Sequence, residues 1–331
     1  MAGILVTGAS GFIGAHVARR LAADGHRVVA TGRDASRLAA LQPEVANVVA
    51  CDLAADALDP LLQGIEVIVH CAALSSPWGR AEDFQRANVT ATQRLLDGAR
   101  RNGVRRFIHL GSPSIYFRFR DQYDVGEDFE PPTRWITEYA RSKWASECVV
   151  RAAADARLQT LILRPRAVFG EGDRAILPRL LAAAQRGWFP LVDGGRALID
   201  VTHIDNLVAL VAHCVDADLP GNGRAYNVRN AEPVRVHALL KTLFDELAVD
   251  TRLVGLPRAP ALALAALSEG VARLRRGQPE PKLTRYGIGV LGYSQTLDVT
   301  RARRELGYAP QMSTDAGLAC FARWWSSHDR A

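Results

Sequence analysis

The N-terminal segment constrains the fold more than any other part of the chain. Residues 3–7 form a short apolar run, typical of a buried parallel strand. Glycines at Gly8, Gly11 and Gly14 follow at once, and residues 16–24 then show helical spacing of apolar side chains. In a strand–turn–helix unit, glycines at this spacing allow a tight turn, close approach of the backbone to a pyrophosphate, and close helix packing. The segment predicts a dinucleotide site rather than an ordinary glycine-rich turn, with the helix N-terminus facing the anion.

Further strand-like runs alternate with helical stretches along the first half of the chain. The runs are residues 4–6, 27–31, 47–50, 67–70, 106–110 and 160–163. This alternation predicts an α/β fold, a doubly wound parallel Rossmann sheet with helices on both faces. After Arg164 the alternation breaks, with helices expected at 205–215 and 236–248 and short strands at 225–228 and 252–254. We expect an NAD(P)-binding domain over residues 1–165. A smaller, mostly substrate-binding α/β domain should cover 166–331, with segments returning to the Rossmann core.

Tyr139 and Lys143 lie four residues apart in an alanine-rich stretch, residues 135–156, that contains neither Gly nor Pro. We expect this stretch to be a helix, so the phenol and the ammonium should emerge on one face. A free phenol has a pKa near ~10, and an adjacent ammonium would lower it by about one to three units. The pair predicts a tunable acid/base, although Tyr-x-x-x-Lys alone also occurs on ordinary surface helices.

The glycine turn and the Tyr139–Lys143 pair together resemble the extended short-chain dehydrogenase/reductases, and the resemblance covers nearly the whole chain. Other segments match that family in order. They are Asp52-Leu53, His70-Cys-Ala-Ala73, Asn88-Val-Thr-Ala-Thr92, residues 107–116 with Ser112-Pro-Ser-Ile-Tyr116, and Leu163-Arg-Pro-Arg-Ala-Val-Phe-Gly170. Ala91 replaces the glycine that is usual in the Asn88 motif. The joint order of these motifs is much more specific than any one of them.

The resemblance implies a role for each matching residue. Tyr139 would be the general acid/base, Lys143 would lower its pKa and bind the nicotinamide ribose, and Ser112 would hydrogen-bond the substrate oxygen. Asn88 would help to hold a water relay to the lysine. The implied cofactor-binding residues are Gly8, Ser10, Gly11, Phe12, Ile13, Gly14, Arg33, Asp52, Leu53, Ala72, Ala73, Tyr139, Lys143, Pro165 and Val168. Those expected toward the substrate are Ser114, Tyr116 and Arg166. Ser114 is the alternative to Ser112, and either serine could instead cap local backbone.

Within that family the chain resembles the 3β-hydroxysteroid dehydrogenase-like branch, through residues 163–181 and 283–308. The branch includes sterol dehydrogenases and 2-alkyl-3-oxoalkanoate reductases. The resemblance implies hydride transfer between NAD(P) and a bulky apolar ketone or secondary alcohol, either steroid-like or a long-chain 3-oxo acid. The loop 117–132 is rich in aromatic side chains that could line an apolar pocket or serve as core anchors; they are Phe117, Phe119, Tyr123 and Phe129.

Two other functions stay open. A nucleotide-sugar epimerase or dehydratase shares the fold, but the Thr-Asp/Glu pair usual in dehydratase loops is absent from Ser112-Pro-Ser114. A non-catalytic dinucleotide-sensing regulator would tend to lose the Tyr, Lys or Ser of the active site, and this chain keeps all three.

The end of the second strand predicts the cofactor. A carboxylate there binds the ribose 2′-OH of NAD, whereas an arginine accommodates the 2′-phosphate of NADP. Thr31 or Gly32 stands where the acid is expected, and Arg33 follows. Because arginine matches phosphate bidentately, we favour NADP(H) over NAD(H). Asp34 keeps NAD possible unless it caps the next helix, and Arg37 could assist Arg33.

Composition argues against several other classes. A net charge of +6 over 331 residues is modest. Nucleic-acid binding would require a basic stripe interleaved with aromatic residues, and the sequence shows none. Five cysteines without metal-like spacing indicate free thiols in a reducing compartment and no metal site. The first strand begins directly, without a signal peptide, and the apolar runs fall short of the ~20 residues of a membrane span. We expect a cytoplasmic homodimer with a small-molecule substrate.

The segment 257–276 combines an apolar run, 259–267, with the basic end Arg273-Leu-Arg-Arg276. It could be a core or interface helix whose basic end suits the helix dipole. It could also be a lid over a lipid-like substrate, or a basic amphipathic helix that docks on a membrane. The sequence favours these three in that order.

Overall fold

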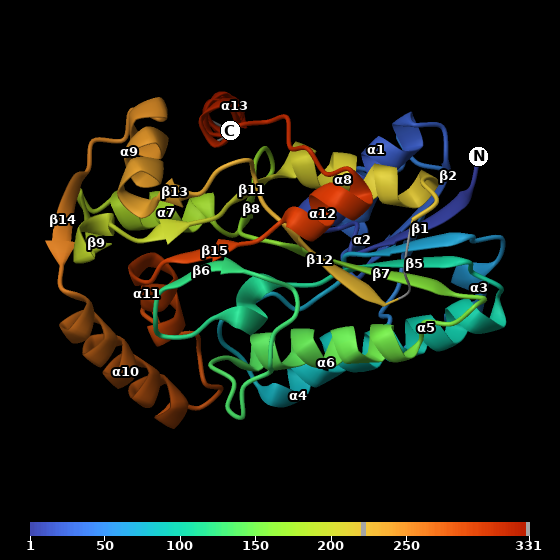
Figure 1. Cartoon of the computed structure of the whole chain (residues 1–331), viewed down its shortest axis with the longest axis horizontal. Coiled ribbons are helices and arrows are strands. Elements are labelled where there is room, and N and C mark those ends of the chain that lie inside the picture. The colour runs from blue at the N-terminus through green and yellow to red at the C-terminus, as the bar shows by residue number, and fades with distance from the viewer. Residues whose placement is uncertain (220–222, 329–331) are drawn as a thin grey trace.

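A parallel sheet of seven strands forms the centre of the protein in the computed structural model, which describes residues 1–219 and 223–328 (Figure 1). In sheet order the strands are β12 (Arg224–Val228), β7 (Gln159–Pro165), β5 (Arg106–Leu110), β4 (Val67–His70), β1 (Gly3–Thr7), β2 (Arg27–Gly32) and β3 (Asn47–Ala50). Each neighbouring pair is parallel. The strand order reverses between β1 and β4, which opens a crevice at the carboxyl ends of the strands. The predicted fold class is confirmed.

Helices cover both faces of this sheet (Figure 1). One face carries α1 (Phe12–Ala23), α2 (Ala35–Ala39), α8 (Ile204–Asp216) and α12 (Thr300–Leu306), and the other α3 (Asp59–Leu62), α4 (Ala81–Phe84), α5 (Ala91–Arg101) and α6 (Glu138–Ala152). A π-helical turn, η1 (Gln85–Thr90), joins α4 to α5. Successive strand residues point to opposite faces, so Ile4 and Val6 pack in the core with α1, and Leu5 packs in the core with α5. Because both faces are covered, every residue of β1 is buried.

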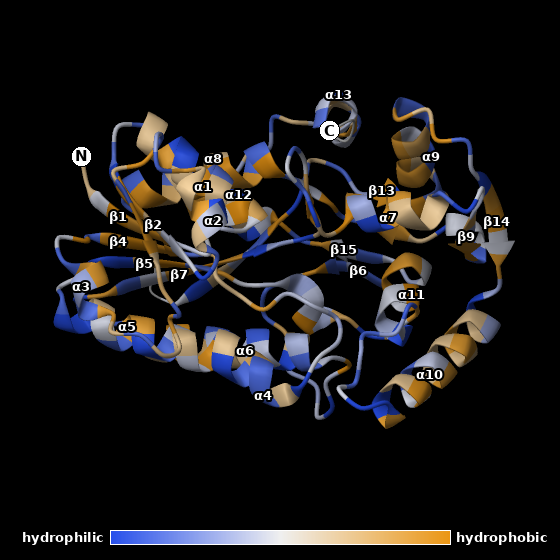
Figure 2. Ribbon diagram, turned by 180° about the vertical axis from the view of Figure 1, so that it is seen from behind, coloured by the Kyte–Doolittle hydropathy of each residue, from blue (hydrophilic) through white to orange (hydrophobic). Residues whose placement is uncertain are grey.

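A smaller group of elements lies beyond the carboxyl ends of the main strands (Figure 2). Its strands are β13 (Val234–Arg235), β10 (Leu198–Ile199), β15 (Gln295–Leu297) and β6 (Gln122–Val125) in one sheet, and the pairs β8 (Val168–Phe169) with β11 (Thr202–His203) and β9 (Trp188–Val192) with β14 (Arg252–Leu256). Its helices are α7 (Leu177–Ala184), α9 (Val236–Glu246), α10 (Arg258–Leu274), α11 (Arg285–Gly292) and α13 (Thr314–His328). Short 3₁₀ turns are η2 (Pro113–Tyr116), which directly follows the end of β5, and η3 (Asp193–Gly195). β6 reaches this group from the first half of the chain, whereas β12, α8 and α12 return to the main sheet.

The helix that carries Tyr139 and Lys143 is shorter than the predicted 135–156. α6 begins at Glu138 because the Thr137 hydroxyl caps it, accepting a hydrogen bond from the Ala140 N–H at 3.1 Å. It ends at Ala152, and the Asp155 carboxylate then accepts bonds from the backbone N–H groups that follow it. These side-chain bonds offer the backbone a turn in place of further helix. The two predicted site residues remain inside the helix.

Candidate active site

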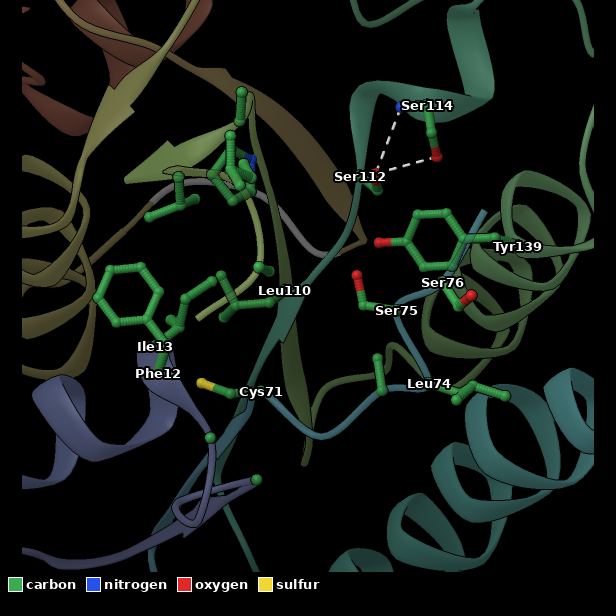
Figure 3. A pocket seen from close by; sticks show the side chains of 18 of the residues that line it. Phe12, Ile13, Cys71, Leu74, Ser75, Ser76, Leu110, Ser112, Ser114 and Tyr139 are labelled. Carbon is green, nitrogen blue, oxygen red and sulfur yellow. Dashed lines mark hydrogen bonds between the residues drawn. The ribbon is translucent and has the colours of Figure 1, made fainter. Parts of the chain in front are cut away.

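The carboxyl ends of the central strands open into a cavity of about 760 Å³. The glycine turn after β1 and the ends of β2, β4 and β5 form one side of it, and residues of α7 and α11 form the other. Figure 3 shows side chains from several of these elements converging on the same space. Residues from both halves of the chain therefore surround one cavity, as a reaction between a dinucleotide and a second molecule requires.

The glycine turn forms the wall next to β1. Gly8 has a φ of +68°, in the left-handed region, and a Cβ there would lie 2.7 Å from the backbone N of Ala72. A Cβ at Gly14 would lie 2.3 Å from the Gly8 carbonyl oxygen. α1 begins at Phe12, earlier than the predicted residue 16, and no side chain caps it. The first N–H groups of this helix, those of Phe12, Ile13 and Gly14, are thus left for an anion, and these residues line the cavity. The arrangement fits a pyrophosphate.

Arg33 lies at the edge of the cavity, directly after β2. Its side chain is exposed, and no hydrogen bond or ion pair reaches its guanidinium from the described part of the chain. Asp34 caps α2 by accepting the Arg37 N–H at 3.1 Å, and the Arg37 guanidinium pairs with the Asp34 carboxylate at 3.1 Å. Arg37 is therefore engaged with Asp34, which leaves Arg33 as the unpaired arginine directly after β2 in the described residues. Further cofactor-binding candidates also line the cavity, namely Ser10, Asp52, Leu53, Ala72, Ala73, Pro165 and Val168.

Tyr139 projects from the start of α6 into the cavity, with its hydroxyl facing Ser112 and Ser75 (Figure 3). Burial raises the pKa of the phenol above 10.0, and hydrogen bonds with Ser112 and Ser75 partly offset this rise. The Ser112 Oγ donates a hydrogen bond to the Ser114 Oγ at 3.0 Å and accepts one from the Ser114 N–H at 3.3 Å. Of the two candidate serines, Ser112 is hydrogen-bonded to Tyr139, and Ser114 supports Ser112.

Lys143 is buried one helical turn after Tyr139 and also lines the cavity. Its Nζ donates a hydrogen bond to the Leu110 carbonyl oxygen at 2.5 Å and lies 3.4 Å from the Nε2 atom of His109. Burial lowers the pKa of Lys143 to about 8, while Glu147 acts in the opposite direction. The hydroxyl groups of Ser112 and Ser75 lower the pKa of Tyr139. That the Lys143 ammonium also lowers it stays a prediction.

Asn88 is buried in η1 and does not line the cavity. Its Oδ1 accepts the Leu74 N–H at 2.7 Å, and its Nδ2 donates to the Leu74 carbonyl at 3.2 Å and to the Ser142 Oγ at 2.9 Å. These bonds occupy the amide, and none joins Asn88 to Lys143 in the described residues. A water relay from Asn88 to the lysine stays a prediction. The bonds to Leu74 fix the loop that presents Ser75 to the cavity.

Tyr116 was expected near the substrate, but it lies in the interior and not in the cavity. Its hydroxyl donates a hydrogen bond to the Asn227 Oδ1 at 2.8 Å and accepts one from Arg164. Arg164 is fully buried and pairs with Glu147 at 2.6 Å. A buried ion pair needs its remaining donors satisfied, and this need explains why the phenol turns inward.

Two aromatic residues of the loop 117–132, Phe117 and Phe129, likewise serve as core anchors. Phe117 packs against Tyr286 with ring centroids 5.2 Å apart, Phe129 packs against Tyr116 at 4.8 Å, and Tyr123 is exposed. None of the loop's aromatic rings lines the cavity. The interpretation of this loop as a pocket wall is wrong, because Phe117 and Phe129 pack against other rings and Tyr123 faces solvent.

The end of the cavity next to α11 combines buried polar groups with apolar side chains. Arg166 and Asp200 are buried, and the Arg166 Nε and the Asp200 Oδ1 have no partner among the described residues. The Tyr286 hydroxyl hydrogen-bonds to Arg166, while burial raises the pKa of that phenol. The apolar lining comes from α7 and α11, with Leu177, Leu180, Val290 and Leu291. Arg166 lies where the sequence placed it. Ser75, Asp200 and Tyr286 were missed, and only Tyr286 fell in a segment, 283–308, that the sequence had marked.

The cavity lining excludes α10, the helix at the predicted segment 257–276. α10 packs against α11, and it is α11 that borders the cavity. The interpretation of this segment as a lid whose apolar side chains cover the substrate is therefore wrong.

Comparison with known proteins identifies the family. The NAD dependent epimerase/dehydratase family matches residues 4–228 of the chain. The chain belongs to this family. It is 39% identical to the uncharacterized protein YbjS of Escherichia coli (strain K12), over 99% of this chain and 98% of that protein. It is 33% identical to the 2-alkyl-3-oxoalkanoate reductase of Stenotrophomonas maltophilia (strain K279a), over 95% of this chain and 97% of the reductase. The solved structure of MoeE5 with UDP-glucuronic acid and NAD has a TM-score of 0.79 at 26% identity, covering 98% of this chain and 99% of that one.

These findings confirm that the chain is an oxidoreductase of the extended short-chain dehydrogenase/reductases and uses a nicotinamide dinucleotide. The described part of this dehydrogenase/reductase contains no group of His, Cys, Asp and Glu side chains suited to a metal ion. None of its described helices is both long and apolar enough to cross a bilayer.

Proposed function

We propose that this oxidoreductase interconverts a bulky apolar ketone and the corresponding secondary alcohol, with Tyr139 as the general acid/base. One observation carries the proposal: the Tyr139 hydroxyl meets Ser112 and Ser75 in the same cavity as the glycine turn that fits a pyrophosphate. A proton donor, a second hydroxyl for the substrate oxygen and a dinucleotide site are the parts that carbonyl reduction requires.

When bound, the nicotinamide supplies or accepts the hydride. In ketone reduction the Tyr139 hydroxyl donates its proton to the carbonyl oxygen, and its raised pKa keeps that proton in place at neutral pH. The Ser112 Oγ, positioned by the Ser114 N–H, turns its proton from the Ser114 Oγ to the same oxygen and donates a hydrogen bond to it. In alcohol oxidation Tyr139 accepts the proton. Lys143 is cationic below its pKa of about 8, and its place one helical turn from Tyr139 suits a hydrogen bond to the nicotinamide ribose.

The lining of the cavity supports a large apolar substrate with one polar end. Leu177 and Leu180 of α7 face the same cavity as Val290 and Leu291 of α11. Arg166 offers a buried guanidinium with a free Nε, which suits an acidic group. A long-chain 3-oxo acid combines both features, and the 2-alkyl-3-oxoalkanoate reductase similar to this chain is consistent with it. A steroid-like ketone is the second substrate class within this proposal.

Arg33 supports a preference for NADP(H) over NAD(H). Its guanidinium is exposed at the cavity edge and free of protein partners among the described residues, so it is available for a 2′-phosphate. Asp34, the carboxylate that could have bound a ribose hydroxyl, is engaged with α2 and Arg37.

A nucleotide-sugar epimerase or dehydratase is the second candidate, favoured by the likeness to MoeE5, whose structure holds UDP-glucuronic acid and NAD. The apolar side chains of α7 and α11 favour the ketone reductase. The division into a cofactor-binding domain, residues 1–165, and a mostly substrate-binding domain, residues 166–331, remains a prediction. The homodimer and the cytoplasmic location also remain predictions.

The test is a panel of 3-oxo acids and cyclic ketones of increasing size, with NADPH or NADH consumption followed by absorbance. Each buried CH₂ contributes roughly 0.8 kcal/mol, so kcat/KM should rise about fourfold per CH₂ until the cavity is filled. Tyr139→Phe should lower turnover by about 10² or more and leave NADPH binding near normal. Tyr123→Phe, an exposed tyrosine, is the matched control and should retain activity. A flat response to substrate size, together with turnover of a UDP-sugar, would establish the epimerase instead.

A further inference from the structure

Helix α10 has one face in the protein and one face in solvent. Ala261, Ala265 and Ala272 are buried, and the buried Glu269 carboxylate accepts the Arg285 backbone N–H of α11 at 2.7 Å. The opposite face exposes four large apolar side chains: Leu264 by 54%, Leu267 by 69%, Val271 by 53% and Leu274 by 90%. Their spacing of three and four residues places them in one row along the helix. We call this row the α10 ridge. In Figure 1 α10 lies at the outer edge of the molecule, remote from the seven-stranded sheet.

The exposed face of α10 contains almost no polar group. Its exposed residues between positions 259 and 274 are Ala259, Pro260, Ala263, Leu264, Ala266, Leu267, Gly270, Val271, Arg273 and Leu274. Only Arg273 in this set is charged, whereas surface helices normally carry charged side chains on the solvent face. A continuous apolar strip on an exposed helix indicates a surface that another phase or molecule covers.

Positive charge gathers at the C-terminal end of the same helix. Arg273 lies over the ring of Trp78 at 5.6 Å, and Arg275, Arg276 and Lys282 follow, all exposed. In the described residues no ion pair neutralises Arg275, Arg276 or Lys282. The acidic residue nearest to them in sequence, Glu280, pairs with Arg179 at 3.4 Å. The α10 ridge therefore ends in a cluster of free cations.

This basic end is attached to the loop that borders the cavity. The Trp78 Nε1 donates a hydrogen bond to the Gln278 carbonyl at 2.9 Å, and the residues just before Trp78, from Leu74 to Pro77, line the cavity. Arg179, the partner of Glu280, lines it as well. Whatever surface the α10 ridge contacts is thus held close to residues that line the cavity.

From this arrangement we infer that α10 docks on an anionic lipid surface, with the α10 ridge in the interface and the basic end on phosphate headgroups. A basic amphipathic helix binds a bilayer in this way, through buried apolar area and attraction to anionic lipid. A second copy of the chain would match the ridge, but its α10 would bring no acidic group to meet Arg275 and Arg276. An anionic lipid surface supplies both an apolar phase for the α10 ridge and negative charge for Arg275 and Arg276. The docking would place the cavity near a lipid phase, where an apolar substrate concentrates.

Flotation with lipid vesicles tests this inference without substrate or cofactor, so its outcome is independent of the proposed reaction. The full chain should float with vesicles of phosphatidylcholine containing phosphatidylglycerol, but not with phosphatidylcholine alone, and added salt should weaken binding. Leu264→Gln with Leu267→Gln should lower the partition coefficient by about tenfold or more per leucine. Arg275→Glu with Arg276→Glu should lower it about fivefold or more per residue.

Two matched controls carry similar changes elsewhere. Arg303→Glu with Arg304→Glu makes the same charge change at exposed positions of α12, and Tyr123→Gln removes an exposed apolar ring from β6. Both should float like the original chain, and thermal melting should show that all variants fold. The inference is overturned if the original chain fails to float, or if the ridge variants float equally well. It is also overturned if light scattering shows that Leu264→Gln with Leu267→Gln splits a dimer, because the ridge is then a subunit interface.

Discussion

The guanidinium of Arg33 lies at the cavity edge without a protein partner in the described residues. The neighbouring Asp34 carboxylate is already bonded to the N–H and the guanidinium of Arg37. Arg33→Ala should weaken NADPH about tenfold to a hundredfold, since a hydrogen bond to a charged group contributes about 1.5–3 kcal/mol. NADH, which lacks the phosphate, should change little. Titration of each dinucleotide by fluorescence or calorimetry measures the effect. Arg37→Ala is the control and should spare both, because Arg37 is paired with Asp34. Tighter binding of NADH than NADPH by the original chain would contradict the assignment.

Tyr139 shows how burial and hydrogen bonding compete at a single residue. Burial raises the pKa of the phenol, the hydroxyls of Ser112 and Ser75 lower it, and the first effect is the larger. The ammonium of Lys143 donates a hydrogen bond to the Leu110 carbonyl oxygen at 2.5 Å. The phenol of Tyr139 therefore keeps its proton at neutral pH.

At the scale of elements, α11 and not α10 supplies apolar lining to the cavity, although the sequence had offered the segment of α10 as a lid. Val290 of α11 lines the cavity, whereas Leu267 of α10 is exposed. Val290→Ala removes two methyl groups from the lining. At roughly 0.8 kcal/mol for each buried carbon, kcat/KM should fall about tenfold for large ketones and change little for small ones. Leu267→Ala should leave both values unchanged when substrates are supplied in solution. Equal losses for the two variants would show that α10 also contacts the substrate.

At the scale of the whole molecule, Asp200 ties the two groups of elements together. It lies between β10 and β11, its Oδ2 accepts the Leu297 N–H of β15 at 2.6 Å, and Arg229, which follows β12 of the main sheet, approaches it at 3.5 Å. The carboxylate is fully buried, and burial raises its pKa to about 6, more than Arg229 and the Leu297 N–H lower it. The contribution of Asp200 to the free energy of unfolding should therefore depend on pH.

A raised carboxyl pKa gives stability that is present below the unfolded value of 3.8 and is lost as pH rises through about 6. The original chain should therefore lose stability between pH 4 and pH 7, whereas Asp200→Asn should not lose this contribution. The free energy of unfolding of the variant, relative to that of the original chain, should increase over this range. At 1.36 kcal/mol per pKa unit, the increase should be at most about 3 kcal/mol. Urea unfolding at each pH provides the measurement. Asp250→Asn, at an exposed carboxylate, should give a pH-independent difference. The same flat difference for Asp200→Asn would refute a pH-dependent contribution of Asp200.

The sequence by itself determined the glycine turn that forms one wall of the cavity. It also determined that Tyr139 and Lys143 share one face of a helix. Both depend on local rules: Gly8 is needed for a positive φ, Gly14 for close packing, and residues four apart share a helix face. The alternation of strands and helices was equally local, and it predicted the parallel sheet correctly. Helix ends were less predictable, because a cap such as Thr137 or a turn at Asp155 overrides the apolar pattern.

Only the tertiary structure decided which side chains meet Tyr139 and which leave the site. Ser75 and Asp200 come from separate parts of the chain and carry no motif, so no local pattern marks them, and the marked segment 283–308 gave no role to its Tyr286. Tyr116 left the expected site because the buried Arg164–Glu147 pair needed its hydroxyl. Satisfying buried charges and filling the core are properties of the assembled molecule, and a motif read along the chain cannot register them.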